Sequence, residues 1–471
     1  MRKAKIVCTI GPVCSSEEIL RKMILAGMDV ARLNFSHGDH ASHRQTHERL
    51  RKLAVNCKRP LAILQDVQGP RVRLGRFAGG RVRVQTGESF VLTTREIDGD
   101  ETRAAVQYDR LHEDVAKGDR MLIADGAIQL RVVDVEGRDI LTKVVTGGVL
   151  EDHKGVNLPG VHISTPSVTE KDKRDIRLGL ELGMDLLAIS FVRGPEDVLE
   201  ARRMVRRAES DCQVIAKIEH PDAVDSLDDI LDVCDGIMVA RGDLGVELPP
   251  ERVPAIQKLA IQRANARGKL VIVATQMLDS MIRHPRPTRA EASDVANAVF
   301  DGTDALMLSG ETAIGAYPLE SLQMMVRIIG EAEKSTAFRN GPSPTLLKDP
   351  AKFTNAISRA TVSASQDISA RSIVAFTESG QTARLISDYR PQARIIALTP
   401  HHGTYNRMAM LWGVEPVKVS AVRNTDAMLR QVNKTLVERG FAQIGEELVI
   451  TSGVPLGQPG ATNMLKLHRV S

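Results

Sequence analysis

The stretches Val214-Ile215-Ala216-Lys217-Ile218-Glu219 and Gly236-Ile237-Met238-Val239-Ala240-Arg241-Gly242-Asp243 decide the fold class of this chain. Each is a short apolar run, rich in Val and Ile, which is typical of a strand buried in a parallel sheet. Each run also ends among charged residues. Carboxylates at neighbouring strand ends can hold a divalent cation, and Lys217 and Arg241 supply positive charge for an anionic substrate. The two stretches therefore predict an α/β protein with a site at its strand ends.

Eight apolar runs of strand length alternate with amphipathic stretches of helix length. This alternation predicts a closed (β/α)8 TIM barrel, and a doubly wound open sheet is the alternative. Ser15 with Glu18, and Thr288 with Glu291, have the spacing of capping boxes at helix starts. The predicted strands are residues 5–10, 29–33, 61–66, 186–190, 213–218, 235–240, 269–274 and 304–308.

Two further regions interrupt or follow the barrel pattern. Between Arg71 and Leu158 the sequence changes to short alternating strands, which predict a small β-barrel or sandwich inserted as a lid after the third barrel strand. The Pro-containing stretch Asn340-Gly341-Pro342-Ser343-Pro344 is an expected linker. Beyond it, strands predicted at 372–376, 394–398, 415–419 and 447–450 indicate a separate α/β domain. The expected limits are 1–70 and 159–335 for the barrel, 71–158 for the lid and 345–471 for a C-terminal α/β regulatory domain.

The composition is that of an ordinary globular protein. Among 471 residues, 42% are hydrophobic and 26% charged, the net charge is only +4, and aromatics make up 3%, so neither a basic surface nor stacking platforms for nucleic acid are expected. No apolar run reaches the roughly 18 residues of a membrane span, and the N-terminus does not resemble a signal peptide. We therefore expect a cytoplasmic protein with no membrane partner. Five scattered cysteines without a C-x-x-C pair indicate reduced thiols: Cys8, Cys14, Cys57, Cys212 and Cys234.

Polar or charged residues follow seven of the eight predicted strands. In a barrel these strand ends meet at the catalytic face, although any single residue there is equally compatible with a helix cap or a surface charge. The set lacks a His or Cys nucleophile arrangement, and the chain has neither a G-x-x-x-x-G-K-[ST] loop nor a G-x-G-x-x-G motif after a strand. Carboxylates, cations and hydroxyls favour metal-assisted phosphoryl transfer. The residues are Arg32, Asn34, Ser36, Asp66, Ser190, Arg193, Lys217, Glu219, Arg241, Asp243, Thr275, Gln276, Ser309 and Glu311.

Several long segments, in this order, resemble the pyruvate kinase family. The resemblance covers the barrel almost completely, the insert in outline and the C-terminal domain more loosely. The segments are Lys5-Ile6-Val7-Cys8-Thr9-Ile10-Gly11-Pro12, Ala31-Arg32-Leu33-Asn34-Phe35-Ser36-His37-Gly38, Ile215-Ala216-Lys217-Ile218-Glu219, Met238-Val239-Ala240-Arg241-Gly242-Asp243-Leu244-Gly245-Val246-Glu247, Ala274-Thr275-Gln276-Met277-Leu278, Pro287-Thr288-Arg289-Ala290-Glu291 and Met307-Leu308-Ser309-Gly310-Glu311-Thr312.

The resemblance implies the glycolytic reaction of phosphoenolpyruvate and ADP to pyruvate and ATP, in a homotetramer. It implies that Glu219 and Asp243 bind Mg²⁺, for which Mn²⁺ can substitute. Lys217 would neutralise the transferring phosphoryl group, and Thr275 would lie near the enolate carbon and move a proton through water. It further implies catalytic or substrate-phosphate contacts at Arg32, Arg73, Ser190 and Gly242, and nucleotide contacts at Asn34, His37, Arg73 and Lys154.

The chain departs from the family pattern at the third strand. Members that need K⁺ have Asp-Thr-Lys-Gly-Pro-Glu, where this chain has Asp66-Val67-Gln68-Gly69-Pro70-Arg71. We expect the guanidinium of Arg71, near Asn34, Ser36 and Asp66, to take the place of K⁺, so that K⁺ is not required. The alternative is a solvent-facing arginine at a hinge. A smaller departure is Ala124-Asp125-Gly126, where the family usually has two acids before the glycine.

The segment Thr377-Glu378-Ser379-Gly380-Gln381-Thr382-Ala383 lies between a predicted strand and a predicted helix. Backbone N–H groups and hydroxyls at a helix N-terminus can bind an anion. The corresponding loop of the family holds phosphorylated effectors, so Thr377, Ser379, Gly380 and Thr382 are expected to bind a sugar phosphate or nucleoside monophosphate. An ordinary capped turn is the alternative.

Two other functions compete with this interpretation. A metal-dependent C–C lyase barrel that handles pyruvate or phosphoenolpyruvate would share the Lys-x-Glu and Asp pattern, but it has no need for an inserted lid or arginine-rich phosphate contacts. A metabolite sensor on an inactive barrel would have lost a catalytic group. Lys217, Glu219, Asp243 and Thr275 are all present.

Overall fold

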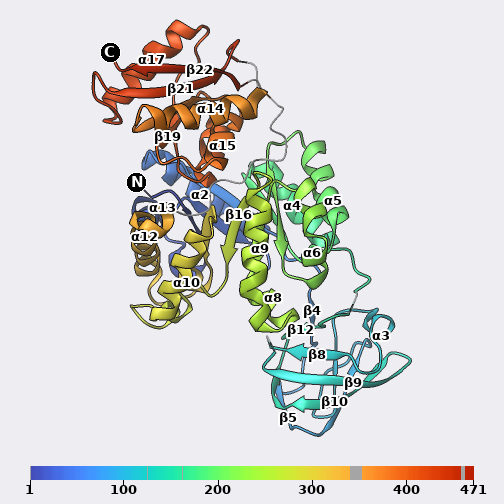
Figure 1. Cartoon of the computed structure of the whole chain (residues 1–471). Helices are drawn as coiled ribbons and strands as arrows, with labels where there is room; N and C mark the ends of the chain where they lie inside the picture. Colours follow the sequence, from blue (N-terminus) through green and yellow to red (C-terminus); the bar gives the residue numbers. More distant parts are fainter. Residues whose placement is uncertain (1, 125, 162, 340–352, 458–461) are drawn as a thin grey trace.

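The computed structural model describes residues 2–124, 126–161, 163–339, 353–457 and 462–471. The expected linker at 340–344 and the acid Asp125 lie outside the described residues. The chain forms three bodies in a row, with the barrel between the inserted β domain and the C-terminal domain (Figure 1).

The first body is a closed barrel of eight parallel strands, as the sequence predicts. The strands follow one another around the barrel in chain order, with the inserted domain between the third and the fourth, and each begins and ends within two residues of its predicted limits. Their side chains are mostly buried on both faces, which explains the continuous apolar runs. The strands are β1 (Lys5–Thr9), β2 (Val30–Asn34), β3 (Ala62–Asp66), β13 (Leu186–Ile189), β14 (Gln213–Ile218), β15 (Gly236–Ala240), β16 (Leu270–Ala274) and β17 (Ala305–Leu308).

Helices cover the outside of the barrel. Their apolar faces pack on the strands in one hydrophobic cluster, which includes Leu20, Ile176, Val198 and Ile261. They are α1 (Glu17–Ala26), α2 (His40–Asn56), α4 (Glu170–Leu182), α5 (Pro195–Arg207), α6 (Pro221–Asp225), α7 (Leu227–Val233), α8 (Arg241–Glu247), α9 (Val253–Asn265), α10 (Arg289–Phe300), α11 (Gly310–Ala313), α12 (Pro318–Lys334) and α13 (Thr336–Arg339).

One of the two predicted helix starts is wrong by one residue. Helix α10 begins at the predicted box, where Thr288 and Glu291 cap each other. Helix α1 instead begins after Ser16, whose hydroxyl accepts a hydrogen bond from the amide of Ile19 at 3.3 Å. The preceding 3₁₀ helix, Pro12–Cys14, has Ser15 as its C-cap, so Ser15 is not available as the N-cap of α1.

The inserted domain is a small β structure that closes on itself. Seven strands form one sheet in the order β4-β12-β8-β9-β10-β6-β7, and β11 pairs with β5. An isolated bridge between Leu74 and Val106, which follow β4 and β7, links the two edges of the seven-stranded sheet, and of the predicted barrel or sandwich it favours the barrel. The elements are β4 (Val72–Arg73), β5 (Arg81–Val84), β6 (Ser89–Thr93), β7 (Arg103–Ala105), α3 (Leu111–Asp114), β8 (Arg120–Ile123), β9 (Ile128–Glu136), β10 (Asp139–Thr146), β11 (Gly148–Glu151) and β12 (Gly155–Asn157).

The C-terminal domain is the predicted α/β domain, with one strand more than expected. Strand β22 (Thr462–Arg469) pairs antiparallel with β21, and its side chains, all but one at least partly exposed, lack the apolar run that marks the other strands. The sheet order is β20-β19-β18-β21-β22. The other elements are β18 (Ser372–Phe376), β19 (Arg394–Thr399), β20 (Val414–Lys418), β21 (Glu447–Gly453), α14 (Phe353–Asp367), α15 (Gln381–Asp388), α16 (His402–Arg407) and α17 (Thr425–Glu438).

The C-terminal domain is attached to the end of the barrel where the strands begin. Arg384 donates to the carbonyls of Asp235 and Gly268, which precede β15 and β16, at 2.8 and 2.9 Å. Arg390 pairs with Asp304, just before β17, at 2.7 Å. The opposite end, where the strands finish, therefore faces the inserted domain (Figure 1).

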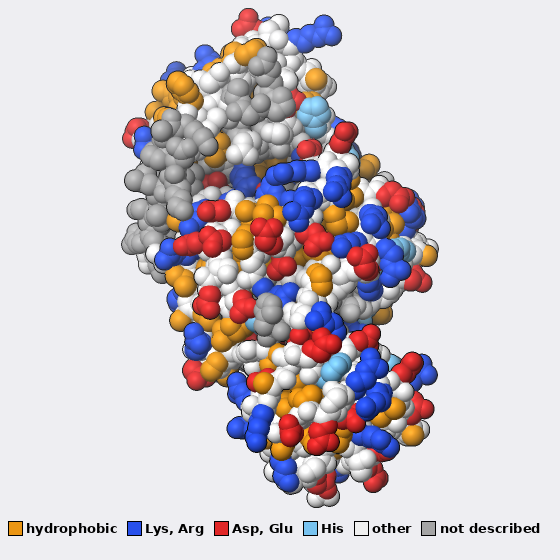
Figure 2. Space-filling view, turned by 90° about the vertical axis from the view of Figure 1, so that its right-hand side faces the viewer, with side chains coloured by type: hydrophobic (Ala, Val, Ile, Leu, Met, Phe, Trp, Pro, Cys, Tyr) orange, Lys and Arg blue, Asp and Glu red, His pale blue; other side chains and the backbone are white. Residues whose placement is uncertain are grey.

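The mixed surface charge and the free cysteines are those expected from the composition. Lys and Arg are interspersed with Asp and Glu over the face shown in Figure 2. All five cysteines are free thiols, and only Cys57 is more than marginally exposed. Burial raises the pKa of Cys212 to well above its usual range and that of Cys234 to about 11, so these thiols stay protonated. In the described part of the chain, none of the helices has the length and apolarity needed to cross a membrane.

Candidate active site

Asp66 lies at the centre of the polar cluster where the barrel strands end. It finishes β3, directly opposite Asn34 of β2, and is 1% exposed. Its Oδ2 accepts from Nε of Arg32 at 2.7 Å, and its Oδ1 is 3.3 Å from Nζ of Lys217. Burial alone would raise the pKa of Asp66, but the charges of Arg32 and Lys217 outweigh it, so the pKa is lowered. The two cations thus share one buried counter-ion.

Lys217 points inward from β14 and is held by several groups at once. Its Nζ lies 2.8 Å from Oε1 of Glu219 and donates to Oγ of Ser190 at 2.7 Å. Burial disfavours its charge, but Asp66, Glu219 and Asp243 more than compensate, so the pKa of Lys217 is raised. This lysine is therefore a fixed ammonium, oriented towards the mouth of the barrel by carboxylates and a hydroxyl.

The two predicted metal ligands follow adjacent strands. Glu219 comes directly after β14, and Asp243 lies in the first turn of α8, after β15. Burial raises the pKa of Glu219, Lys217 opposes this, and Asp243 raises it further. Two carboxylates at the ends of adjacent strands are a suitable donor set for Mg²⁺, which proteins usually hold by one or two carboxylates together with waters and substrate phosphates. The residues present thus fit a divalent cation.

Thr275 follows β16 in a strained conformation. Its φ is +72° and that of Gln276 is +54°, values that residues other than glycine rarely adopt. Arg241 stabilises this turn by donating to the carbonyl of Thr275 at 2.8 Å, while the Thr275 hydroxyl accepts from the amide of Gly242 at 2.7 Å. The turn fixes the hydroxyl of Thr275 beside the start of α8.

This arrangement corrects the expected role of Arg241. Its guanidinium binds the turn at Thr275 and pairs with Asp294 at 2.6 Å, so its charge braces the loop instead of facing a substrate. Arg193 is also structural, since it donates to the carbonyls of Ile163 and Thr165. A place directly after a strand does not by itself determine the direction in which a long side chain turns.

Three further predicted residues, Arg71, Arg73 and His37, lie beside the cluster. Arg71, Arg73 and Arg32 are close enough to His37 for their charges, added to the effect of burial, to lower the pKa of His37. Arg71 likewise contributes to lowering the pKa of Arg73. Three guanidinium groups and a neutral imidazole form a surface suited to phosphate groups.

Some predicted contacts are not formed in this conformation. Arg71 is exposed, and among the described residues no hydrogen bond or ion pair joins it to Asn34, Ser36 or Asp66. Lys154 pairs with Glu151 at 2.9 Å inside the inserted domain. Sequence reasoning also missed Thr9, whose hydroxyl accepts from Arg32 at 2.9 Å at the end of β1. The signal in the sequence that could have identified Thr9 is its position at the end of the first barrel strand.

The predicted effector loop is a compact turn at the start of α15. The Thr377 hydroxyl accepts from the amide of Gly380 at 2.9 Å, and Thr382 bonds Thr462 at 2.7 Å. Glu378 pairs with His401 at 2.5 Å. Of the four predicted residues only Ser379 is exposed.

Comparison with known proteins decides the family. The model of the pyruvate kinase barrel domain matches residues 1–322, and that of the pyruvate kinase alpha/beta domain matches residues 355–468. The chain belongs to the pyruvate kinase family. It is therefore a phosphotransferase, and membership of this family excludes the C–C lyase alternative.

Pyruvate kinases similar to this chain include those of Staphylococcus aureus strains MRSA252 and USA300. Each is 46% identical over 472 residues, which span 100% of this chain and 81% of the relative. The crystal structure of a pyruvate kinase from Cryptosporidium parvum aligns with a TM-score of 0.93 at 36% identity, covering 100% of this chain and 96% of that one. The barrel, the insert and the C-terminal domain are thus shared with a solved pyruvate kinase.

Proposed function

We propose that this pyruvate kinase transfers the phosphoryl group of phosphoenolpyruvate to ADP in a Mg²⁺-dependent reaction of glycolysis. The observation that carries the proposal is the buried ammonium of Lys217, held between Asp66 and Glu219 at the strand ends next to Asp243. Phosphoryl transfer needs positioning and neutralisation of charge more than covalent chemistry. A fixed ammonium beside a metal-ready carboxylate pair provides both.

The residues around Lys217 divide into binding and proton-moving groups. Glu219 and Asp243 would hold Mg²⁺, or Mn²⁺ in its place, which would neutralise phosphate oxygens. Arg32, Ser190 and Gly242 would bind the substrate, and Asn34, His37, Arg73 and Lys154 would bind the nucleotide. The hydroxyl of Thr275, fixed by its strained turn, would direct a water that protonates the enolate.

A coupled assay of pyruvate formation tests the function. We expect pyruvate and ATP in equal amounts when phosphoenolpyruvate, ADP and Mg²⁺ are all present. We expect loss of activity when EDTA removes the metal, because the two carboxylates and one ammonium cannot neutralise the negative charge of the phosphate groups without it. Adding back Mn²⁺ is expected to restore turnover. Pyruvate released without ADP would contradict phosphoryl transfer to the nucleotide.

We further propose that Arg71 makes the enzyme independent of K⁺. The support is its position: its charge acts on His37 and Arg73 at the substrate side of the barrel, and it has no ion-pair partner among the described residues. Movement of the inserted domain towards the barrel would bring Arg71, which follows β3 by five residues, closer to Asn34, Ser36 and Asp66.

The assay in different salts tests this role. The wild type is expected to have the same kcat in KCl and in tetramethylammonium chloride, since the guanidinium supplies the monovalent charge. Arg71→Glu, which removes that charge and adds a carboxylate, is expected to be active only with K⁺. A strong K⁺ requirement of the wild type would refute the proposal, and Arg76→Glu, which alters an exposed charge inside the inserted domain, is the control.

We propose that the loop of Thr377, Ser379, Gly380 and Thr382 binds a phosphorylated allosteric effector. The α15 N-terminus supports an anion there, and α15 also holds the barrel through Arg384. Ser379→Glu, which places a second carboxylate beside Glu378, is expected to abolish activation by a panel of sugar phosphates and nucleoside monophosphates. Unchanged activation in Ser379→Glu would place the site elsewhere, and Ser379→Ala is the matched control.

The domain limits, the homotetramer and the cytoplasmic location expected from the sequence remain part of this proposal. Protonated, unpaired thiols support a reducing compartment. Sedimentation of the purified protein tests the tetramer.

A further inference from the structure

Glu247 is a buried carboxylate to which the site described above gives no role. It ends α8, one helical turn after Asp243, and is 7% exposed. Its Oε1 accepts a hydrogen bond from Nδ2 of Asn157, at 3.1 Å. Asn157 ends β12 of the inserted domain, so this contact joins that domain directly to the helix that presents Asp243.

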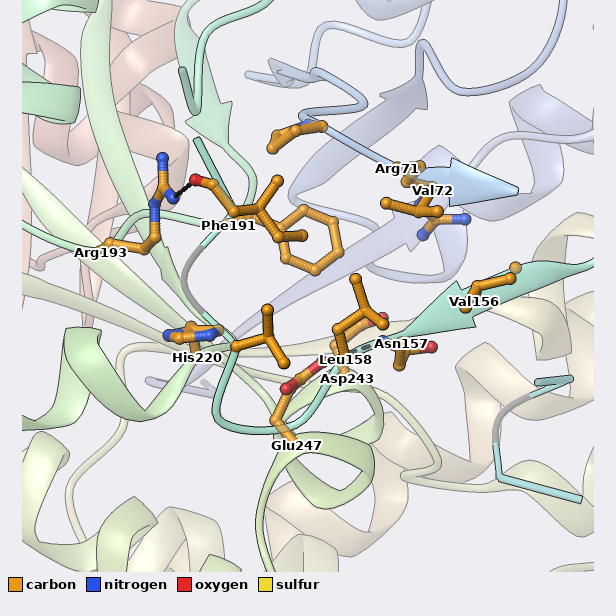
Figure 3. A pocket seen from close by; sticks show the side chains of 14 residues that line it. Arg71, Val72, Val156, Asn157, Leu158, Phe191, Arg193, His220, Asp243 and Glu247 are labelled. Atoms are coloured by element: carbon orange, nitrogen blue, oxygen red, sulfur yellow. Dashed lines mark hydrogen bonds between the residues drawn. The ribbon is translucent and has the colours of Figure 1, made fainter. Parts of the chain in front are cut away.

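The second carboxylate oxygen of Glu247 is buried and has no hydrogen-bond partner within the described part of the chain. Glu247 and Asp243 line a cavity of about 90 Å³ between the barrel and the inserted domain, whose other walls are partly apolar, with Leu158 and Phe191, and partly charged, with Arg71 and Arg193 (Figure 3). Buried polar atoms are normally satisfied, and burying a carboxylate oxygen without a hydrogen-bond partner is unfavourable. Within the described residues, the bond from Asn157 is the hydrogen bond that offsets the burial of this carboxylate, so the positions of Asn157 and Glu247 depend on each other.

Asn157 lies where the inserted domain is connected to the barrel. Strand β12 pairs antiparallel with β4, with Gly155 opposite Arg73, so the chain enters and leaves the domain side by side. Two proposed nucleotide contacts belong to this strand pair, since Arg73 is in β4 and Lys154 directly precedes β12. The bond at Asn157 therefore connects this strand pair to the helix that carries Asp243.

We propose that Glu247 is a positioning residue that aligns the nucleotide-binding strands of the inserted domain with the metal-binding helix. Its carboxylate holds β12 through Asn157, so that Arg73 and Lys154 and the ligand Asp243 keep one relative geometry. The inference rests on the proposed function, because it concerns how nucleotide and metal are placed together.

Kinetics of variants at both ends of the bond test the inference. Asn157→Ala and Glu247→Ala are each expected to raise the KM for ADP about tenfold, with kcat changed less than about threefold, because the contact aligns the nucleotide and does not touch the transferring group. The double variant is expected to match the single ones, since both remove the same bond. Glu247→Gln, whose amide oxygen still accepts from Asn157, is expected to stay within about twofold of the wild-type KM.

Hydrogen exchange gives a measurement that does not depend on turnover. In the ligand-free protein, amides of residues 155–157 are expected to exchange about fivefold faster in Asn157→Ala than in the wild type, because local opening becomes easier. The control is Gln107→Ala, which removes an amide bonded to His153 at 3.1 Å within the inserted domain and is expected to leave this exchange unchanged.

Two results would overturn the inference. One is that the increases in the KM for ADP caused by Asn157→Ala and Glu247→Ala multiply in the double variant. The other is that the amides of residues 155–157 exchange at the wild-type rate in Asn157→Ala. Because Asn157→Ala keeps Glu247 in place, it tests the bond even where Glu247→Ala does not fold. A wild type that makes no pyruvate would refute the proposed function, whereas the exchange experiment would still report on the bond.

Discussion

Lys217→Met is expected to lower kcat by about a thousandfold. An ammonium about 4 Å from a transferring phosphoryl group contributes roughly 4 kcal/mol per unit charge at an effective dielectric constant of 20, and each 1.36 kcal/mol corresponds to a tenfold change in rate. Methionine has a similar length and no charge. The Kd for ADP, measured by calorimetry, is expected to stay within about threefold, because the predicted nucleotide contacts lie on Arg73, His37 and Lys154.

The matched control is Lys269→Met, which removes a partly buried lysine that donates to the carbonyl of Cys234 at the other end of the barrel. Its kcat is expected to be that of the wild type. Thermal unfolding of both variants shows whether the barrel survives, since Lys217→Met leaves Asp66 and Glu219 without their shared cation. A near-normal kcat in a folded Lys217→Met protein would exclude the proposed role of this lysine.

Glu219→Gln is expected to weaken the binding of the divalent cation, and this is the second largest effect that we predict. Removing one of two carboxylates that face a divalent cation is expected to raise its dissociation constant about a hundredfold, which is close to 3 kcal/mol. The amide keeps the shape of the side chain and can still accept from the amide of Phe191, which Glu219 binds at 2.7 Å. Binding of Mn²⁺, followed by electron paramagnetic resonance in the absence of substrates, measures the change without turnover.

Glu181→Gln serves as the control for Glu219→Gln, because Glu181 pairs with Arg44 on the surface of the barrel. Its Mn²⁺ affinity is expected to be that of the wild type. If Glu219→Gln binds Mn²⁺ as tightly as the wild type does, the metal site lies elsewhere.

Most of the fold follows from local sequence pattern. The eight barrel strands are found because strands buried on both faces must be apolar along their whole length, and that signal is contained in the run itself. The exceptions have local causes as well. Ser15 is used by a preceding 3₁₀ turn, so α1 starts one residue later, and β22 is an exposed edge strand without an apolar run.

The site is predictable to the level of residue type and strand end. Lys217, Glu219, Asp243 and Thr275 lie at the mouth of the barrel, as parallel strands of a barrel require. The direction of a long side chain cannot be predicted in this way, because it depends on partners from other strands. Arg241 turns to Asp294 and to the turn at Thr275, and this partnership cannot be read from its position after β15.

The sequence by itself determined which strands exist, their order around the barrel and which chemical groups meet where they end, because period, burial and chain order are local or topological properties. Only the tertiary structure decided the pairings: Asp66 as the shared counter-ion of Arg32 and Lys217, the strained turn held by Arg241, and the bond from Asn157 to Glu247. These contacts join residues that are far apart in the chain. Their energies depend on distance, burial and competing partners, which exist only once the barrel has closed and the inserted domain lies against it.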